Sequence, residues 1–226
     1  MPDWTGPVAR YILHEGLPNT LRVAAIAVVG STLIGVVLGT LLTIPFRPLR
    51  AAIRLYVEIF RGLPILVTVF ATFFFLPTIS PALEFSPLNA GTIALTLWGS
   101  AQVAETTRGA VQSIPAEQRD AAAALGFRWV GSHAYVILPQ ALRRLLPPLV
   151  SLLVNIIQNT TLVGVIGGLD LLEAGKRQNE RLAAFPPVGV GESHAFEILT
   201  AVALMFFVIS FPLARLAAYL EKRLAV

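Results

Sequence analysis

The stretch Asp120-Ala121-Ala122-Ala123-Ala124-Leu125-Gly126, with Val136-Ile137-Leu138-Pro139 beginning ten residues after it, lies between hydrophobic segments that are long enough to cross a bilayer. A run of alanines that ends at a glycine is a poor membrane span, but it suits a short helix that docks against another protein. The sequence therefore predicts an all-α membrane protein with a helix placed to contact a soluble partner.

The composition is typical of a membrane protein. Of the 226 residues, 55% are hydrophobic and 13% are charged, whereas a soluble domain carries about 25% charged residues. The absence of cysteine excludes disulfides and thiolate metal sites, and the three scattered histidines make a metal site improbable. The net charge of +4 comes from basic residues beside apolar segments, which indicates contact with membrane lipid rather than nucleic acid.

Five charge-poor segments approach or exceed the roughly 20 residues that a transmembrane helix needs. They cover residues 23–46, 62–83, 85–104, 145–169 and 198–214. Three prolines interrupt the second segment, and the helix of the third is expected to continue past Glu105. Gly35 and Gly39 in the first segment favour close helix packing, either within the chain or between chains. We expect one membrane domain, residues 1–226, built as a bundle of about five transmembrane helices.

The distribution of basic residues predicts the orientation, because Lys and Arg favour the cytoplasmic side. With the amino terminus outside and the carboxyl terminus inside, 12 of the 17 Lys and Arg residues lie on the inner side. Residues 113–143 are then a cytoplasmic loop, and residues 170–195 an extracytoplasmic one. The outer five are Arg10, Arg22, Lys176, Arg177 and Arg181.

The cytoplasmic loop is predicted to form a helix, a tight turn and a second short helical stretch over residues 128–135. Pro115 suits the first turn of a helix, acidic residues suit its positive end, and Gly126 suits the left-handed conformation that ends it. The alternative is a surface helix that merely links two spans. The residues expected to dock are Glu117, Asp120, Ala121, Ala122 and Gly126.

Polar residues inside predicted spans are candidates for a substrate pathway, because they are costly there unless they face a cavity or a partner. A ligand with an ammonium group would need an acceptor, which Glu105 could supply, and the amides and hydroxyls could donate to a carboxylate. Two alternatives stay open: Glu105 pairs with Arg108 three residues later, and the asparagines bond neighbouring helices. The candidates are Gln102, Glu105, Asn155, Gln158, Asn159, Thr160 and Thr161.

Four motifs resemble the permease subunits of polar amino-acid ABC importers. The loop motif, from Asp120 to Gly126 with Val136-x-Leu138-Pro139, is similar to the EAA loop, which in that family docks on the ATP-hydrolysing subunit. The others are EIFRGLPILV (58–67), AETTRGAVQSIP (104–115) and ILPQALR (137–143) with NTTLVGVIG (159–167). Five positions depart from the residues most common in the family: Leu63, Gln102, Asp120, Gln158 and Asn159.

The resemblance implies the fold of a type I ABC importer permease in the bacterial cytoplasmic (inner) membrane, with a coupling helix in the cytoplasm. It implies three partners: ATPase subunits that use ATP and Mg, a second permease subunit, and an extracytoplasmic amino-acid-binding protein. This chain has no phosphate-binding loop, so no cofactor and no enzymatic activity are expected of it. The implied function is import of polar amino acids by alternating access.

Three other functions remain to be weighed. A permease for another small solute, such as an opine or a cystine-like compound, would have the same motifs. An ion-coupled secondary transporter is weakly supported, because Glu105 is the only carboxylate well inside a span. An intramembrane enzyme would need a nucleophile with a base, and no predicted span contains His, Lys or Cys.

Overall fold

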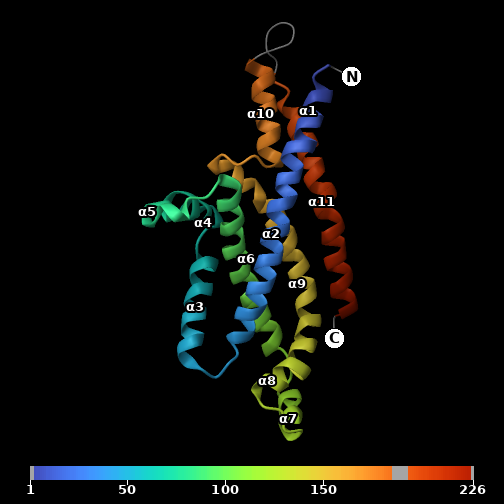
Figure 1. Cartoon of the computed structure of the whole chain (residues 1–226). Helices are drawn as coiled ribbons and strands as arrows, with labels where there is room; N and C mark the ends of the chain where they lie inside the picture. Colours follow the sequence, from blue (N-terminus) through green and yellow to red (C-terminus); the bar gives the residue numbers. More distant parts are fainter. Residues whose placement is uncertain (1–2, 185–192, 225–226) are drawn as a thin grey trace. The chain divides into compact units, whose positions relative to one another are not determined.

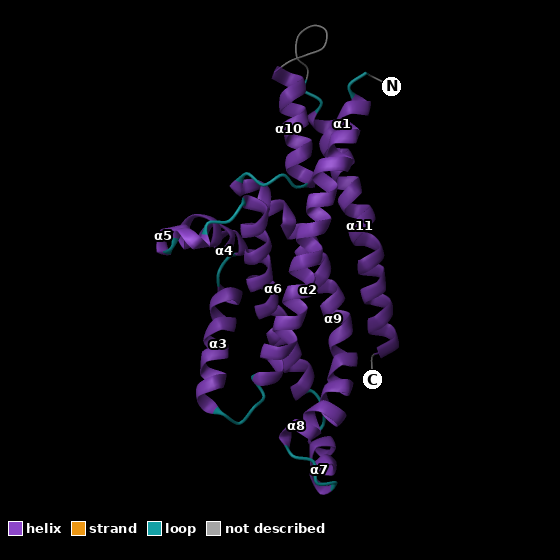
Figure 2. Ribbon diagram, in the orientation of Figure 1, coloured by secondary structure: helices purple, strands orange, loops and turns teal. Residues whose placement is uncertain are grey.

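In the computed structural model, residues 3–184 and 193–224 are described, and within these ranges the chain forms helices joined by short segments, without a β-strand (Figure 2). The predicted all-α class is confirmed. The chain divides into two compact units. Unit 1 comprises Met1–Val28, Pro64–Thr96 and Asn155–Pro212, and unit 2 comprises Val29–Leu63, Leu97–Val154 and Leu213–Val226.

Three helices in the described ranges are long and apolar enough to cross a membrane: Thr5–Leu41, Trp129–Ile166 and Ala195–Leu224. A fourth span is counted if the broken pair Arg47–Gly62 and Ile65–Ile79 forms one. The last of the three, α11 (Ala195–Leu224), exposes large apolar side chains such as Phe207 and Val208, as expected of a helix that contacts lipid. The multi-pass membrane architecture is confirmed, and the count of five spans stays a prediction.

Helix α6 (Pro87–Gln112) covers the predicted third span and continues past Glu105, as expected. It carries several hydroxyl side chains, which lower its hydropathy. Most of these hydroxyls bond back to carbonyls of their own helix: for example, Thr92 donates to Leu88 O at 2.7 Å and Thr106 to Gln102 O at 2.8 Å. Such bonds satisfy a hydroxyl without a partner helix, so α6 can be polar in composition and still lie in an apolar environment.

In unit 2, the second half of α2 (Leu17–Leu41) packs against the second half of α6 through glycines. A side chain at Gly35 would collide with Val103, and one at Gly39 with the carbonyl of Ala104. The small residues therefore serve a contact within the chain. Helix α3 (Arg47–Gly62) adds Ile53 and Val57 to this core.

The predicted second span, 62–83, is not one uninterrupted helix. The chain is extended at Leu63 and Pro64, because proline lacks an N–H and disfavours helical geometry in the residue before it. A helical stretch then runs through α4 (Ile65–Phe70), a π-helical turn (Ala71–Phe75) and α5 (Leu76–Ile79), before the short turn Pro81–Leu83.

In unit 1, the first helix begins much earlier than residue 23. Helix α1 (Thr5–Tyr11) continues through a π-helical turn (Ile12–Gly16) into α2 (Figure 1). Charged residues occupy exposed positions here, while Val8 and Ile12 are buried against α10 (Leu171–Ala184) and α11. Helix α10 occupies most of the predicted loop 170–195, of which residues 185–192 lie outside the described ranges.

Candidate functional site

The predicted docking helix is present as α7 (Ala116–Ala124), directly after Pro115. It ends at Gly126, whose φ of 84° lies in the left-handed region. Gly126 N donates to Ala123 O at 2.9 Å and Phe127 N donates to Ala122 O at 3.0 Å, which is the hydrogen-bond pair of a Schellman motif. The predicted helix and its glycine stop are confirmed.

The predicted second helical stretch, 128–135, is present, but the helix does not end there. The helix that begins at α8 (Trp129–Gly131) continues through a π-helical turn (Ser132–Ile137) into α9 (Leu138–Asn159), across Pro139. A wider turn directly before Pro139 accommodates the ring and the missing N–H that would otherwise break the helix.

Several contacts within unit 2 hold α7, the residues before it and the start of the next helix. Gln140 Nε2 donates to Gln118 Oε1 at 3.2 Å, and Arg144 Nη1 donates to Ser113 O at 2.6 Å. His133, on the turn before α9, stacks on Trp129 and lies 3.2 Å from Thr43 Oγ1 through Nε2. Helix α7 is therefore tied to α9, the helix that continues into a membrane span.

The predicted docking residues do not all face outward. Glu117, Asp120, Ala121 and Gly126 are exposed, whereas Ala122 is 2% exposed and packs into the unit. Sequence reasoning missed a set of exposed apolar side chains around the turn, which we call the apolar rim. The sequence offered one sign of this set, since large apolar residues are unusual in a loop that is otherwise rich in charge. The apolar rim consists of Leu125, Phe127, Val130 and Tyr135.

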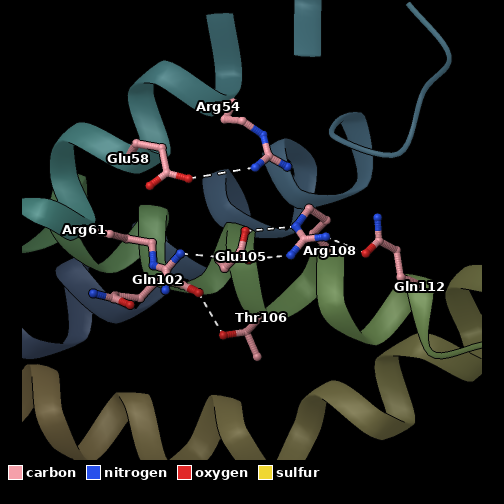
Figure 3. Close-up of polar contacts among 8 residues, drawn as sticks. All are labelled: Arg54, Glu58, Arg61, Gln102, Glu105, Thr106, Arg108 and Gln112. Carbon is pink, nitrogen blue, oxygen red and sulfur yellow. Dashed lines mark hydrogen bonds and ion pairs between the residues drawn. The ribbon is translucent and has the colours of Figure 1, made fainter. Parts of the chain in front are cut away.

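Glu105 lies in a cluster of arginines on α3 and α6 (Figure 3). Arg108 donates through Nε and Nη2 to both carboxylate oxygens of Glu105, at 2.9 and 2.5 Å. Arg61 Nη1 lies 3.9 Å from Glu105 Oε1, and Arg108 also donates to Gln112. The ion pair considered for Glu105 and Arg108 is confirmed. Whether Glu105 also accepts an ammonium group stays a prediction.

The polar cluster of the fourth span lies where the helix changes type. Helix α9 ends at Asn159 and a 3-10 helix covers Thr160–Ile166. Asn159 Nδ2 donates to Asn155 O at 2.8 Å, and Thr160, fully buried, donates to Ile157 O at 2.7 Å. Thr161 Oγ1 donates to Gln158 O at 2.9 Å. Much of this polarity supports the helix transition itself.

Two of these residues, Gln158 and Thr161, line a cavity of about 480 Å³ in unit 1. Its opposite wall comes from α11, with Phe206, Phe207 and Ser210 among the lining residues. The hydroxyl of Ser210 is buried and has no hydrogen-bond partner within the described ranges. Sequence reasoning missed Ser210, because a single serine in an apolar span is usually satisfied by its own helix.

The seven pathway candidates divide between the two units. Gln102 and Glu105 belong to unit 2, on α6, and Figure 3 shows both beside Arg61. The other five belong to unit 1, from Asn155 to Thr161. The part of the chain that the structure describes contains no group of three or more His, Cys, Asp or Glu residues that could hold a metal ion.

Residues 31–226 match the family described as binding-protein-dependent transport system inner membrane component. This chain belongs to that family. The permease is 34% identical over 211 residues to the probable glutamine ABC transporter permease protein GlnM of Bacillus subtilis strain 168, covering 93% of this chain and 92% of that protein. It is 34% identical over 215 residues to the glutamine transport system permease protein GlnP of Escherichia coli strain K12, covering 95% and 94%.

Solved structures agree with this assignment. The permease superimposes with a TM-score of 0.80 and 27% identity, over 99% of both chains, on a structure described as an amino acid ABC transporter with histidines. It shares the fold of the MetNI methionine ABC transporter in inward facing conformations, with a TM-score of 0.70 and 20% identity, over 93% and 96% of the chains. The permease is thus a membrane subunit of an ABC transporter, and ATP hydrolysis resides in a separate subunit.

Proposed function

We propose that this chain is the transmembrane subunit of an ATP-driven importer that moves polar amino acids across the bacterial cytoplasmic membrane by alternating access. The observation that carries the proposal is the tightly closed α7–Gly126 turn, exposed on one side and bonded to α9 on the other, in a chain that resembles glutamine permeases over nearly its whole length. Residues 1–226 are proposed to work as one permease domain.

The docking surface for the ATPase is proposed to be the exposed face of α7. Glu117, Asp120 and Ala121 are exposed on it, while Ala122 faces inward and fixes the orientation of the helix. The apolar rim beside it offers apolar contact area, which a soluble protein rarely exposes unless a partner covers it. Movement of α7 would reach the membrane through the hydrogen bond between Gln118 and Gln140 and through α9.

The substrate pathway is proposed to include the cavity lined by Gln158 and Thr161. The amide and hydroxyl supply hydrogen-bonding groups, and the unpartnered Ser210 hydroxyl adds a third in the same cavity. Asn155, Asn159 and Thr160 are proposed to hold the helix transition that places these groups. Gln102 and Glu105 are proposed to line the pathway within unit 2.

The same proposal includes the partners of this chain and its orientation. The proposed partners are two ATPase subunits that use ATP and Mg, a second permease subunit, and an extracytoplasmic amino-acid-binding protein. The amino terminus of this chain is proposed to lie outside and its carboxyl terminus in the cytoplasm. The basic residues support this orientation, since 12 of 17 then lie inside.

The test is uptake by proteoliposomes that contain this permease with its ATPase and binding protein. We expect ATP-dependent accumulation of radiolabelled L-glutamine, which excess unlabelled polar amino acids reduce. Gln158→Leu should lower the uptake rate while the complex still assembles. Uptake that continues without the ATPase would refute the proposal in favour of an ion-coupled transporter, and competition only by an opine or cystine would reassign the substrate class.

A further inference from the structure

We propose that a second cavity in unit 1, between α1 and α10, binds a free zwitterionic amino acid at a site separate from the Gln158 cavity. This α1–α10 cavity has a volume of about 540 Å³, within the range of about 300–1,000 Å³ that is usual for small-molecule sites. Its polar lining comes from Arg10, Tyr11, His14, Glu15, Gln178 and Arg181.

The walls of the cavity are fixed by close backbone packing. A Cβ at Gly16 would lie 2.7 Å from Ala174 Cβ, so the π-helical turn and α10 touch (Figure 1). Val8, Ile12 and Leu171 are buried beside this contact. A site on such packed helices keeps its geometry without a ligand, which reduces the ordering cost of binding.

The π-helical turn gives its residues different environments. Ile12 is 2% exposed and faces the core, whereas His14 and Glu15 are exposed and line the cavity. Single π-helical turns are rare and are frequent at functional sites. The widened turn thus serves the cavity as well as the core.

The charges of the cavity have no partners of their own. Within the described ranges, no ion pair includes Arg10, Arg181 or Glu15. By contrast, Arg177 on the same helix pairs with Glu173 at 2.8 Å and does not line the cavity. Guanidinium groups bind carboxylates through paired charge-assisted hydrogen bonds, and the Glu15 carboxylate can accept from an ammonium group.

Gln178 is the second, independent indication of a ligand. It is 7% exposed, it lines the cavity, and its side chain makes no hydrogen bond within the described part of the chain. The amide therefore has free hydrogen-bonding capacity toward the cavity, which a polar ligand can use. An amide both donates and accepts, so it suits either end of a zwitterion.

The mixture of charges selects the ligand class. A purely anionic ligand would be attracted by Arg10 and Arg181 but repelled by Glu15. A purely cationic ligand would be attracted by Glu15 but repelled by the two arginines. An amino acid with a free carboxylate and a free ammonium matches both signs. L-glutamine is chosen as the probe because of the proposed function, whereas the zwitterionic ligand class is inferred from the charges of the cavity alone.

The test uses the absence of cysteine from the chain. Gly6 also lines the cavity, and a Cβ there meets nothing within 4 Å, so Gly6→Cys places a single thiol at the site. The complex in lipid nanodiscs is treated with a maleimide, and labelling of the permease is followed by mass spectrometry. We expect L-glutamine to slow labelling saturably, and N-acetyl-L-glutamine, which lacks the ammonium, to be much less effective.

Second-site variants assign the protection to the cavity. Arg181→Gln and Glu15→Gln should each raise the half-protecting concentration about tenfold or more, since each removes a charge-assisted hydrogen bond. Lys176→Gln is the matched control: it removes a positive charge from the exposed surface of the same helix, outside the cavity, and should change this concentration by less than about twofold.

Three results would overturn the inference: no protection at saturating L-glutamine, protection unchanged by Arg181→Gln, or protection by the binding protein alone without free amino acid. The last would identify the cavity as a protein-docking surface. The inference and the proposed function fail separately. Gln158→Leu should lower the uptake rate with protection intact, whereas protection without ATP-driven uptake in the unsubstituted complex would refute only the proposed function.

Discussion

Replacing Gly126 by valine is expected to uncouple ATP hydrolysis from uptake. The φ of 84° at Gly126 is strained for a residue with a side chain, by about 1–2 kcal/mol for an ordinary one and more for a β-branched one. A Cβ at this position would meet nothing within 4 Å, so the penalty is conformational rather than a clash. If the turn relaxes instead, the hydrogen bonds from Gly126 N and Phe127 N are lost.

Either response weakens the α7 turn by 1–2 kcal/mol or more, which corresponds to a change of about 5- to 30-fold in its population. We therefore expect uptake per ATP hydrolysed to fall by a similar factor. The free energy of unfolding of a whole domain is about 5–15 kcal/mol, so the variant should still fold and insert. The assay is the ratio of L-glutamine transported to ATP hydrolysed in proteoliposomes.

The matched control is Gly126→Asn, because asparagine tolerates the left-handed conformation far better than valine does. It should keep most of the coupling. Wild-type coupling in Gly126→Val would refute the reasoning. An equal loss in both variants would also refute it, because the space around Gly126 is open and the two substitutions should differ mainly in how well their backbone adopts a positive φ.

Three further outcomes follow from packing and charge. Asp170 caps α10, and burial raises the pKa of its carboxyl above the usual value near 3.8. The folded state therefore holds this proton more tightly than the unfolded state, so the free energy of unfolding should fall as the pH rises from about 4 through the folded pKa. Asp170→Asn should flatten this pH dependence in thermal unfolding, and an unchanged slope would contradict the prediction. Gly39→Ala should lower the melting temperature by several degrees, because its Cβ meets the Ala104 carbonyl, whereas Gly109→Ala, in open space, should not. Glu105→Gln should reduce the free energy of unfolding by less than about 1 kcal/mol, because the carboxylate is partly solvated; a loss of several kcal/mol would show that the arginine cluster is structurally essential.

Local patterns predicted much of this protein correctly. Pro115, the alanine run and Gly126 predict the start, body and end of α7 from backbone preferences alone, and the structure has all three. The continuation of α6 past Glu105 agrees with the absence of proline until Pro115. The ion pair of Glu105 with Arg108 follows from their spacing of three residues on one helix.

Local patterns did not reveal where one helix continues into the next or which distant segments pack together. The helical stretch expected over 128–135 is present, but a π-helical turn carries it on into α9 across Pro139. Helix α10 lies within the segment 170–195 that was expected to connect two spans, where Asp170 caps it and Ala174 packs closely on Gly16. Gly16 and Ala174 are far apart in sequence, so no local pattern could reveal their packing.

Hydrophobic length and a glycine stop already determined that this chain is a helical membrane protein with a short helix between its apolar segments, because these features depend on residues close together in the sequence. Folding added the two cavities and the buried Gln178 and Ser210, because each depends on side chains from helices far apart in the chain. The sequence alone does not show whether a polar side chain in an apolar helix has a hydrogen-bond partner or lacks one. Only the packing around it shows which of the two it is.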